Sequence, residues 1–447
     1  MSLRDAVAER WQGLPDSMFV LAQRAWLSGS GLITAVVVAY TLTSAEQGWY
    51  YAFLSISSIS ILFDLGLSAL LVQVTAKETM GLEWTHDGQV VGAGADRLAG
   101  FVKGVWRRYQ VSALACLLLV PIGILVFRGR TSTLSFDWVP PWLVMVVATA
   151  ASQAALPWPF ILEGSGRVRE AYLLRLAQGV AGSVGLWLAL LLGASIYAAA
   201  LRPMAGAVFV AAWFMTRRRG LWEQTHSAST AAYPWRERIQ GLHGRTAVSW
   251  IAGYVLMHLY VPVLFSISGP RTAGQMGLSV TIANTLALMA QSWIASSFPR
   301  LAKASAQHAW AAMDRTFRKA VIAGVALYLG GAICVMLGVW GLQPTRYADR
   351  LLPPAWMVCL LLAFLGSHLA TLIEMKVRAY RRDPFAWNSA VCALLMLVLI
   401  VPAAHVAGGM GVVLLSTLIH AGIRLPWSLW LFVVADRDWR NAGAEGV

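Results

Sequence analysis

Residues 385–406 read FAWNSAVCALLMLVLIVPAAHV, and residues 409–434 read GMGVVLLSTLIHAGIRLPWSLWLFVV. The first run contains no charged residue and the second contains only Arg424. About 20 mostly apolar residues in a helix are enough to cross the hydrocarbon core of a bilayer. Each run therefore predicts one transmembrane helix.

Similar apolar runs recur along the whole chain. Of the 447 residues, 58% are hydrophobic and only 13% are charged, whereas a soluble domain carries about 25% charge. The sequence predicts an all-α membrane protein with about twelve transmembrane helices, over residues 18–42, 47–74, 108–127, 138–162, 170–192, 195–216, 245–267, 273–298, 318–341, 351–375, 385–406 and 409–434.

The basic residues give an independent test of this helix count. With the N-terminus inside, 28 of the 35 Lys and Arg fall in segments predicted to be cytoplasmic. Positive residues favour the cytoplasmic side, so twelve helices with both termini cytoplasmic are expected, in a bacterial inner membrane. The net charge of +14 is then a topology signal and a contact with anionic lipid headgroups, and no nucleic-acid partner is expected.

The longest polar interruption near the middle runs from Arg217 to Arg245 and separates six helices from six. We predict an N-terminal six-helix bundle at 1–225, a cytoplasmic linker at 226–244 and a C-terminal six-helix bundle at 245–447. Each half has a longer cytoplasmic connection after its second helix, which favours an internal duplication, a common basis of transporter folds.

The sequence gives no sign of an enzyme. It contains no phosphate-binding Gly-rich loop with Lys-Ser/Thr, no His-Glu-x-x-His and no Gly-x-Ser-x-Gly. Its four cysteines, at 116, 334, 359 and 392, lie within apolar runs and are expected to be reduced packing residues, not metal ligands. No cofactor or metal is expected, and a coupling ion, H⁺ or Na⁺, stays open.

Ionisable side chains at membrane depth are costly, so the few that occur are candidates for function. Asp64 lies well inside the second helix, and Arg24 of the first helix could reach it by snorkelling. Such an Arg24–Asp64 pair would either fix the hairpin or belong to a transport path. Glu163 and Glu374 lie near predicted cytoplasmic helix ends and are expected at the interface.

The other candidates are basic or amide side chains. Helix 8 carries a polar stripe that includes Asn284 and Gln291. Polar stripes either join helices or line a hydrated cavity. A polar, cationic cavity would suit an anionic substrate such as a pyrophosphate, an acidic sugar or a carboxylate. The candidate cavity residues are Arg24, Asp64, Arg202, His258, Asn284, Gln291, His420 and Arg424.

The stretch from Leu42 to Phe53, LTSAEQGWYYAF, resembles the Thr-x-x-Glu-Gln-Gly-aromatic-Tyr-x-Phe signature of polysaccharide-biosynthesis membrane proteins similar to O-antigen flippases. The similarity continues through Phe63-Asp64-Leu65-Gly66-Leu67 and covers about 40 residues. The motif residues are Glu46, Gln47, Gly48, Tyr50 and Tyr51. They could equally form a turn at the end of helix 2, with Trp49, Tyr50 and Tyr51 as an aromatic belt at the interface.

The resemblance implies the multidrug/oligosaccharidyl-lipid/polysaccharide exporter fold, with two six-helix bundles forming a V around a central cavity. It also implies a function: moving an undecaprenyl-pyrophosphate-linked oligosaccharide from the cytoplasmic to the periplasmic leaflet by alternating access, for O-antigen or exopolysaccharide synthesis. Implied partners are this lipid-linked oligosaccharide, membrane lipids, a polysaccharide polymerase and glycosyltransferases.

Two other functions remain open at this point. An ion-coupled multidrug antiporter of the same superfamily would use Asp64 as its coupling-ion site, although a cation exporter would be expected to bury several carboxylates. A non-transporting scaffold for a polysaccharide synthase would need none of the buried charges for transport.

Overall fold

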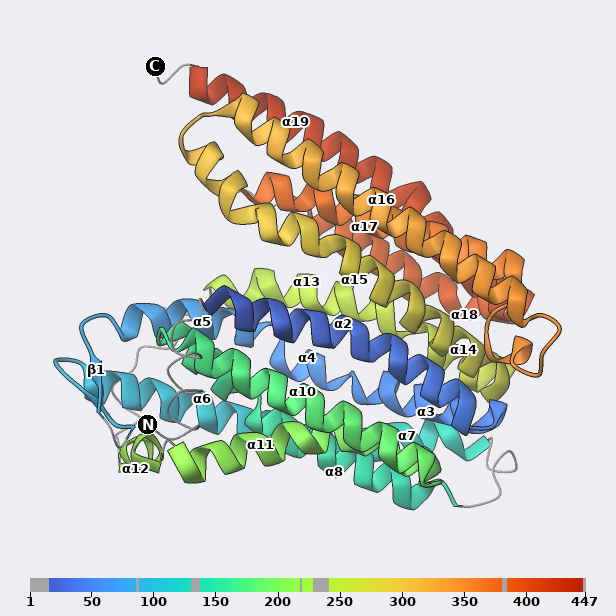
Figure 1. The fold of residues 1–447 in the computed structure, drawn as a ribbon, viewed down its shortest axis with the longest axis horizontal. Helices are drawn as coiled ribbons and strands as arrows, with labels where there is room; N and C mark the ends of the chain where they lie inside the picture. The colour runs from blue at the N-terminus through green and yellow to red at the C-terminus, as the bar shows by residue number, and fades with distance from the viewer. Residues whose placement is uncertain are drawn as a thin grey trace, which may run out of the picture. The chain divides into compact units, whose positions relative to one another are not determined.

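The computed structural model describes residues 16–85, 88–129, 137–217, 219–227, 241–379 and 384–444, and most of them are helical (Figure 1). The chain divides into two compact units. Unit 1 comprises Met1–Ser30, Ser60–Pro121 and Val139–Thr246, and unit 2 comprises Gly31–Ile59, Ile122–Trp138 and Ala247–Val447. Most of the linker predicted at 226–244, residues 228–240, lies outside the described residues, so the three-part division remains a prediction.

The first half of the chain contains helices and one short hairpin. Their bounds are α2 Asp16–Thr41, α3 Ser44–Ser57, α4 Ser60–Asp64, α5 Leu67–Glu78, β1 Glu83–Trp84, β2 Val90–Val91, α6 Ala95–Ala115, η1 Cys116–Leu118, α7 Leu119–Phe127, α8 Val139–Ala155, α9 Pro157–Gly164, α10 Val168–Leu191, η3 Ser195–Ala200, α11 Leu201–Arg217 and α12 Arg219–Ser227. Strands β1 and β2 pair antiparallel, with Glu83 opposite Val91.

The described second half is entirely helix and connecting turn. Its elements are α13 Gly241–His258, α14 Tyr260–Ser268, α15 Pro270–Ala306, α16 Trp310–Leu342, η6 Ala348–Arg350, α17 Pro354–Arg378, α18 Ala386–Thr417, the π-helical η7 Leu418–Arg424 and α19 Leu425–Ala444. Each of the twelve apolar runs predicted from the sequence coincides with one or more of these helices.

Ten helical stretches of the described chain are long and apolar enough to cross a membrane, and the longest is Ala386–Asp438 with 53 residues. This stretch is two helices. Ala407 and Gly408 have non-helical backbone angles, and Asn388 donates a hydrogen bond to Ser428 Oγ at 2.9 Å, although 40 residues separate them. In one straight helix those residues would lie roughly 60 Å apart. The chain therefore reverses at Gly408, as the gap between runs 385–406 and 409–434 predicts.

The predicted second helix is broken into α3, α4 and α5. Leu65 and Gly66 have positive φ angles of 49° and 75°, which interrupt the helix directly after Asp64. Thr43 begins α3 with a capping box: its side chain accepts from the Glu46 backbone N–H, and the Glu46 carboxylate accepts from the Thr43 N–H. The ten stretches become eleven when Ala386–Asp438 is counted as two helices, and the broken segment from α3 to α5 is the twelfth. The described chain therefore accounts for the twelve predicted crossings.

In unit 2, α3 packs on α15 with almost no space between the backbones. A Cβ atom on Gly48 would lie 2.0 Å from the Pro270 carbonyl oxygen, and one on Gly274 would lie 2.8 Å from the Gly48 nitrogen. Neighbouring Gly277 faces the Tyr51 ring in the same way. Small residues are how membrane helices approach closely without a hydrophobic driving force.

The aromatic residues of α3 form part of the core of unit 2. The Trp49 ring lies 5.1 Å from Phe127, 5.8 Å from Trp138 and 5.0 Å from Phe265, between ring centroids. Trp49 is 0% exposed, and Tyr50 and Tyr51 are also buried. The aromatic belt expected at the interface is therefore wrong, because these rings pack inward, whereas the turn at the start of α3 is confirmed.

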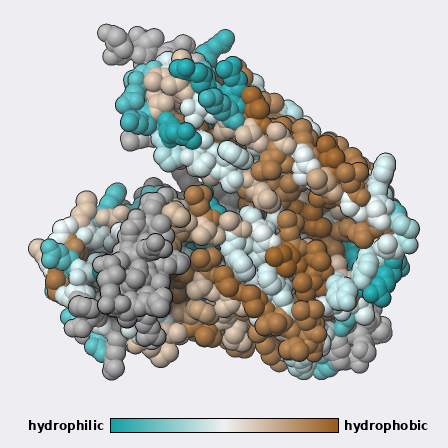
Figure 2. All heavy atoms as spheres, in the orientation of Figure 1, coloured by the Kyte–Doolittle hydropathy of each residue, from teal (hydrophilic) through white to brown (hydrophobic). Residues whose placement is uncertain are grey.

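Unit 1 has its own apolar core, which α5, α6, α9, α10 and α11 share. Trp158 and Phe214 lie near its centre, 4.2 Å apart between ring centroids. Outside the cores, large apolar side chains such as Leu192 and Val406 are fully open to the surroundings, at 86% and 87% exposure. On the face shown in Figure 2, hydrophobic residues form broad areas. Such surfaces suit lipid and not water, and the chain is a multi-pass membrane protein.

The Gly48 contact predicts a selective loss of stability. Gly48→Ala should lower the free energy of unfolding by about 1–3 kcal/mol, because the new methyl group forces α3 away from α15. Gly338→Ala in α16 is the matched control, since a Cβ there meets nothing within 4 Å. Melting temperatures in detergent would measure both, and equal values for the two variants would contradict the tight α3–α15 contact.

Candidate functional site

Asp64 is buried within unit 1, and its carboxylate is already hydrogen-bonded. Tyr109 Oη of α6 donates to one carboxylate oxygen, and Ser68 Oγ donates to the other at 2.8 Å. Asp64 is 4% exposed. The expected Arg24–Asp64 ion pair is not formed: the carboxylate is buried and accepts from these two hydroxyl groups, whereas Arg24 is exposed. The break at Leu65 is what places Asp64 against α6.

The positive charges of the two basic candidates in unit 1, Arg24 and Arg202, are poorly compensated by neighbouring side chains. Arg24 of α2 is exposed and forms no hydrogen bond or ion pair with any described residue, although it lies near Tyr172. Arg202 of α11 makes only long contacts from Nη2, 3.5 Å to Ser30 Oγ and 3.4 Å to Ser183 Oγ. Neither cation has a carboxylate partner among the described residues. An anion would supply the missing charge.

The hydroxyl groups of the polar stripe on α15 bond to their own helix. Thr281 donates to the Gly277 carbonyl and Thr285 to the Thr281 carbonyl, both at 2.8 Å. Asn284 and Gln291 behave differently, since both are half-buried and neither amide has a partner in the described chain. Seven residues separate them, so they lie on the same face of α15. These two amides are available to a ligand.

The two candidate histidines have different surroundings in unit 2. His258 is half-buried at the break between α13 and α14, where its ring stacks on Tyr254 at 5.4 Å and its carbonyl accepts from Ser55 Oγ at 3.0 Å. His420 is buried in η7, with its Nε2 3.4 Å from Tyr260 Oη. His258 can be reached by a ligand, whereas His420 belongs to the packed interior.

Arg424 is held by a structural ion pair. Its Nη2 lies 2.9 Å from Glu374 Oε1 of α17, and its Nη1 donates to Ser367 Oγ at 3.3 Å. Glu374 is 4% exposed, so it is not the interfacial residue expected from its place near the helix end. Arg378, one turn further along α17, lies 3.6 Å from the other carboxylate oxygen. The ion pair therefore compensates the charge of Arg424, and its Nε is buried without a hydrogen-bond partner among the described residues.

The residues of the Glu-Gln-Gly motif have structural contacts. Glu46 caps α3, and Gly48 permits the approach of α15. Gln47 is 1% exposed, and its amide nitrogen donates to the backbone carbonyls of Gly274 and Arg350, both at 2.9 Å. The motif thus fixes α3 to α15 and to the loop before α17.

The candidates therefore fall into two groups. Asp64, His420 and most of the motif residues are buried, Arg424 and Glu46 are half-buried, and all of them contact other parts of the protein. Arg24, Arg202, His258, Asn284 and Gln291 present incompletely satisfied or accessible polar groups, and none of these five is a carboxylate. Among the described residues, no group of three His, Cys, Asp or Glu could hold a metal ion, and the cysteines are free.

Sequence reasoning missed three participants in these networks. Tyr109 was not considered as the partner of Asp64, and Glu374 was not considered as the partner of Arg424. Arg350 is not among the candidates from the sequence, yet its Nη1 is buried without a hydrogen-bond partner among the described residues. An unpaired guanidinium can be found only after the loop has been placed.

The helix arrangement of this chain is similar to that of several solved structures. The chain matches the lipid II flippase MurJ in an inward closed conformation, with a TM-score of 0.64 and 12% identity over 95% of this chain and 90% of that one. It matches an inward-facing multidrug resistance MATE family transporter of the MOP superfamily, with a TM-score of 0.60 and 14% identity over 95% and 96%. An outward-facing structure of such a transporter gives 0.55 and 13% over 95% and 97%.

The chain shares the fold of these MATE transporters and of the MurJ flippase. At 12–14% identity the likeness concerns the fold, and it agrees with the superfamily implied by the motif at residues 42–53. The structures that share the MOP fold are transporters and a flippase, not enzymes. No family model matches the sequence, and no curated protein matches it.

The Arg424–Glu374 pair can be tested as a structural element of this MOP fold. Arg424→Met alone should lower the free energy of unfolding by about 3–5 kcal/mol, because it leaves the Glu374 carboxylate buried without its principal partner. The double variant Arg424→Met/Glu374→Met should recover much of this loss, since buried pairs replaced by apolar side chains are often neutral. Melting temperatures of both would test the pair, and equal losses would show that the two residues do not interact.

Proposed function

We propose that this chain is a flippase for a lipid-linked oligosaccharide. It would move an undecaprenyl-pyrophosphate-linked oligosaccharide from the cytoplasmic to the periplasmic leaflet of a bacterial inner membrane by alternating access. Both termini would lie in the cytoplasm, as the charge distribution predicts. A polysaccharide polymerase and glycosyltransferases would be its partners, and it would need no cofactor beyond an unidentified coupling ion.

The observation that carries this proposal is the chemistry of the accessible intramembrane groups. Arg24 and Arg202 are cations without carboxylate partners in the described chain, and Asn284 and Gln291 are free amides. Guanidinium groups suit phosphate, and amides suit sugar hydroxyls. The membrane-embedded carboxylates Asp64 and Glu374, in contrast, are buried and hydrogen-bonded. This set of side chains favours an anionic, hydroxyl-rich substrate.

Shared fold adds support of a different kind. One neighbour is itself a lipid II flippase, so the MOP fold is compatible with moving a lipid-linked headgroup. The motif at residues 42–53 adds the link to polysaccharide synthesis.

Reconstituted flipping would test the proposal. In proteoliposomes containing a fluorescent undecaprenyl-pyrophosphate-linked sugar, Arg24→Gln and Gln291→Ala should each slow flipping about tenfold or more, equivalent to about 1.4 kcal/mol of lost interaction. Arg128→Gln, which removes an exposed charge at the end of α7, is the control. Unchanged melting temperatures would separate lost function from lost folding.

Two results would contradict the flippase. One is wild-type protein that does not accelerate flipping. The other is a deletion strain that still makes its surface polysaccharide and accumulates no lipid-linked sugar on the cytoplasmic side. Normal function of a variant lacking Arg24, Asp64 and Arg424 together would instead favour the scaffold.

The antiporter remains the second candidate because of Asp64. This carboxylate lies at a helix break, and Glu78 and Glu374 are buried carboxylates as well. Asp64→Asn should abolish cation-driven dye efflux from vesicles if Asp64 binds the coupling ion. If its role is to hold α6, Asp64→Asn and Tyr109→Phe should lower the melting temperature by similar, non-additive amounts.

A further inference from the structure

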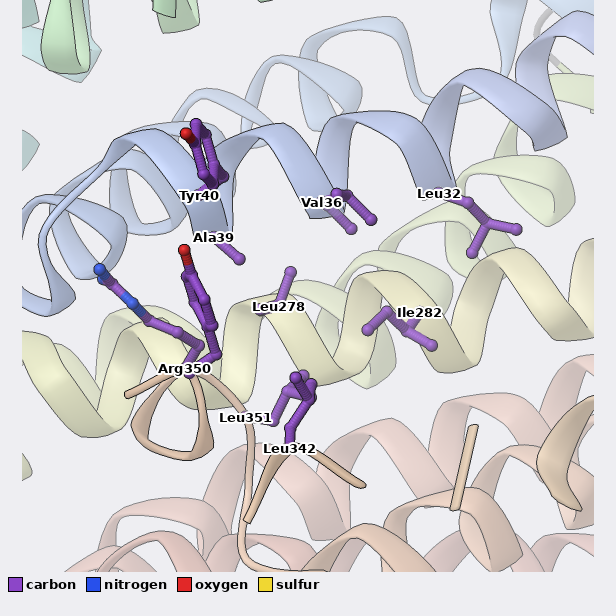
Figure 3. A pocket seen from close by; sticks show the side chains of 11 residues that line it. Leu32, Val36, Ala39, Tyr40, Leu278, Ile282, Leu342, Arg350 and Leu351 are labelled. Carbon is purple, nitrogen blue, oxygen red and sulfur yellow. The ribbon is translucent and has the colours of Figure 1, made fainter. Parts of the chain in front are cut away.

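Unit 2 contains an apolar groove between α2, α15 and the loop before α17. Its volume is about 430 Å³, within the range of roughly 300–1,000 Å³ usual for small-molecule sites. In Figure 3, Leu32, Val36 and Tyr40 of α2 face Leu278 and Ile282 of α15. Leu342, Tyr347, Arg350 and Leu351 complete the lining together with Ala35 and Ala39.

The groove is long enough for a hydrocarbon chain and is open on one side. From Leu32 to Tyr40 it follows α2 for about 12 Å, at 1.5 Å per residue. Near its apolar end α2 and α15 come together, since a Cβ on Gly31 would lie 3.0 Å from Thr285 Oγ1. Val36 and Tyr40 are 68% and 64% exposed, so the outer edge is accessible from the membrane.

The other end of the groove is basic. Arg350 lines it, and its Nη1 is buried without a hydrogen-bond partner in the described chain. Burial lowers the pKa of the Arg350 guanidinium, whereas Tyr347, Glu46 and Asp349 lie within electrostatic range and raise it. Arg346 is close by and donates from Nη2 to Tyr347 Oη at 2.9 Å.

The nearby carboxylates already have partners. Asp349 lies 2.6 Å from Arg271 Nη2, and Glu46 accepts from the Thr43 backbone. Arg346 and Arg350 therefore form a cationic pair at the mouth of an apolar groove. The chemistry that complements it is a phosphate-bearing headgroup with a hydrocarbon tail.

The loop that carries Arg350 is held firmly in place. The Arg350 carbonyl accepts from Gln47, the Asp349 carbonyl accepts from Gln275 Nε2 at 3.1 Å, and the Leu352 N–H donates to buried Ser279 Oγ at 3.1 Å. These bonds come from α3 and α15. The guanidinium is thus presented on a fixed backbone, as a binding site requires.

We propose that this groove seats the polyprenyl-pyrophosphate carrier of the substrate, with the first part of the isoprenoid chain between α2 and α15 and the pyrophosphate at Arg350 and Arg346. The proposal rests on the proposed flippase function. With the N-terminus in the cytoplasm, the loop at 342–350 between the ninth and tenth predicted helices is expected to be periplasmic, so the seat would hold the carrier in the outer leaflet, after translocation.

Two features favour this carrier over a bilayer phospholipid. This groove runs between one pair of helices, α2 and α15, and its volume of about 430 Å³ suits part of one hydrocarbon chain, whereas a phospholipid has two. Two arginines four residues apart also suit the several charges of a pyrophosphate better than the single charge of phosphatidylglycerol.

Binding to the full chain in phosphatidylcholine nanodiscs would test the seat, with radiolabelled undecaprenyl pyrophosphate as the probe. Arg350→Gln should raise the Kd about tenfold through the lost charge. Ala39→Trp should raise it by a similar factor by filling the groove. The matched controls are Arg128→Gln and Ala212→Trp, both at exposed positions, and they should bind as wild type does.

Competition distinguishes the occupants. Inorganic pyrophosphate should compete weakly, because it cannot use the groove, and phosphatidylglycerol should also compete weakly. The seat is wrong if folded Arg350→Gln and Ala39→Trp both bind like wild type, or if either competitor displaces the probe as well as unlabelled undecaprenyl pyrophosphate does. Val36→Trp, at an exposed groove position, replaces Ala39→Trp if that variant does not fold.

Flipping measured on the same proteins separates this proposal from the proposed function. If wild type binds the probe, loses it in both groove variants and yet flips no lipid-linked sugar, the seat stands and the flippase does not. If wild type flips the lipid-linked sugar while both variants bind the probe normally, the flippase stands and the seat does not.

Discussion

The packing of α3 on α15 through Gly48 is the contact on which most of unit 2 depends. Because no side chain separates the Gly48 and Pro270 backbones, the Gln47 amide reaches both the Gly274 and the Arg350 carbonyls. The same approach places Trp49 among Phe127, Trp138 and Phe265. A motif that could be taken for a ligand site is therefore first a device for joining a helix, a loop and an aromatic cluster.

Lipid imposes the second constraint, because an uncompensated charge or polar group in hydrocarbon is expensive. Structural charges are compensated by neighbouring side chains: Tyr109 and Ser68 donate hydrogen bonds to Asp64, and Glu374 forms an ion pair with Arg424. Where such compensation is missing, another explanation is needed. Arg24, Asn284 and Gln291 have no such partners within the described residues, and for this reason they carry the functional proposal more strongly than the deeply buried charges do.

Much of the fold could be predicted from the sequence, because each helix must be apolar over the thickness of the membrane and each loop carries a charge signal. Even the reversal at Gly408 inside one long helical stretch follows from two runs separated by Ala407 and Gly408. The side-chain partners could not be predicted in this way. Spacing places Asp64 on α4 but does not reveal that the break at Leu65 turns it towards Tyr109.

The candidate site was harder to predict for the same reason. The depth of Arg424 in its helix indicates that it needs a counter-ion, water or a ligand, and the packing of α17 against η7 identifies the counter-ion as Glu374. The groove at Arg350 combines residues 32–40, 278–282 and 342–351, three segments that no sequence pattern connects. Conversely, the aromatic residues of α3 have a composition typical of an interface, and only packing shows them to be core.

Three of the five boundaries between the two units fall at a turn or at residues that favour helix bending. Unit 1 ends within α2 at Ser30, in the run Ser28-Gly29-Ser30-Gly31, and unit 2 ends at Ile59 in the turn between α3 and α4. The third boundary follows Pro121, within α7. Glycine, serine and proline are the usual sites of helix bending, and membrane helices tolerate them. At these three positions the division between the units therefore coincides with a turn or with residues that favour helix bending.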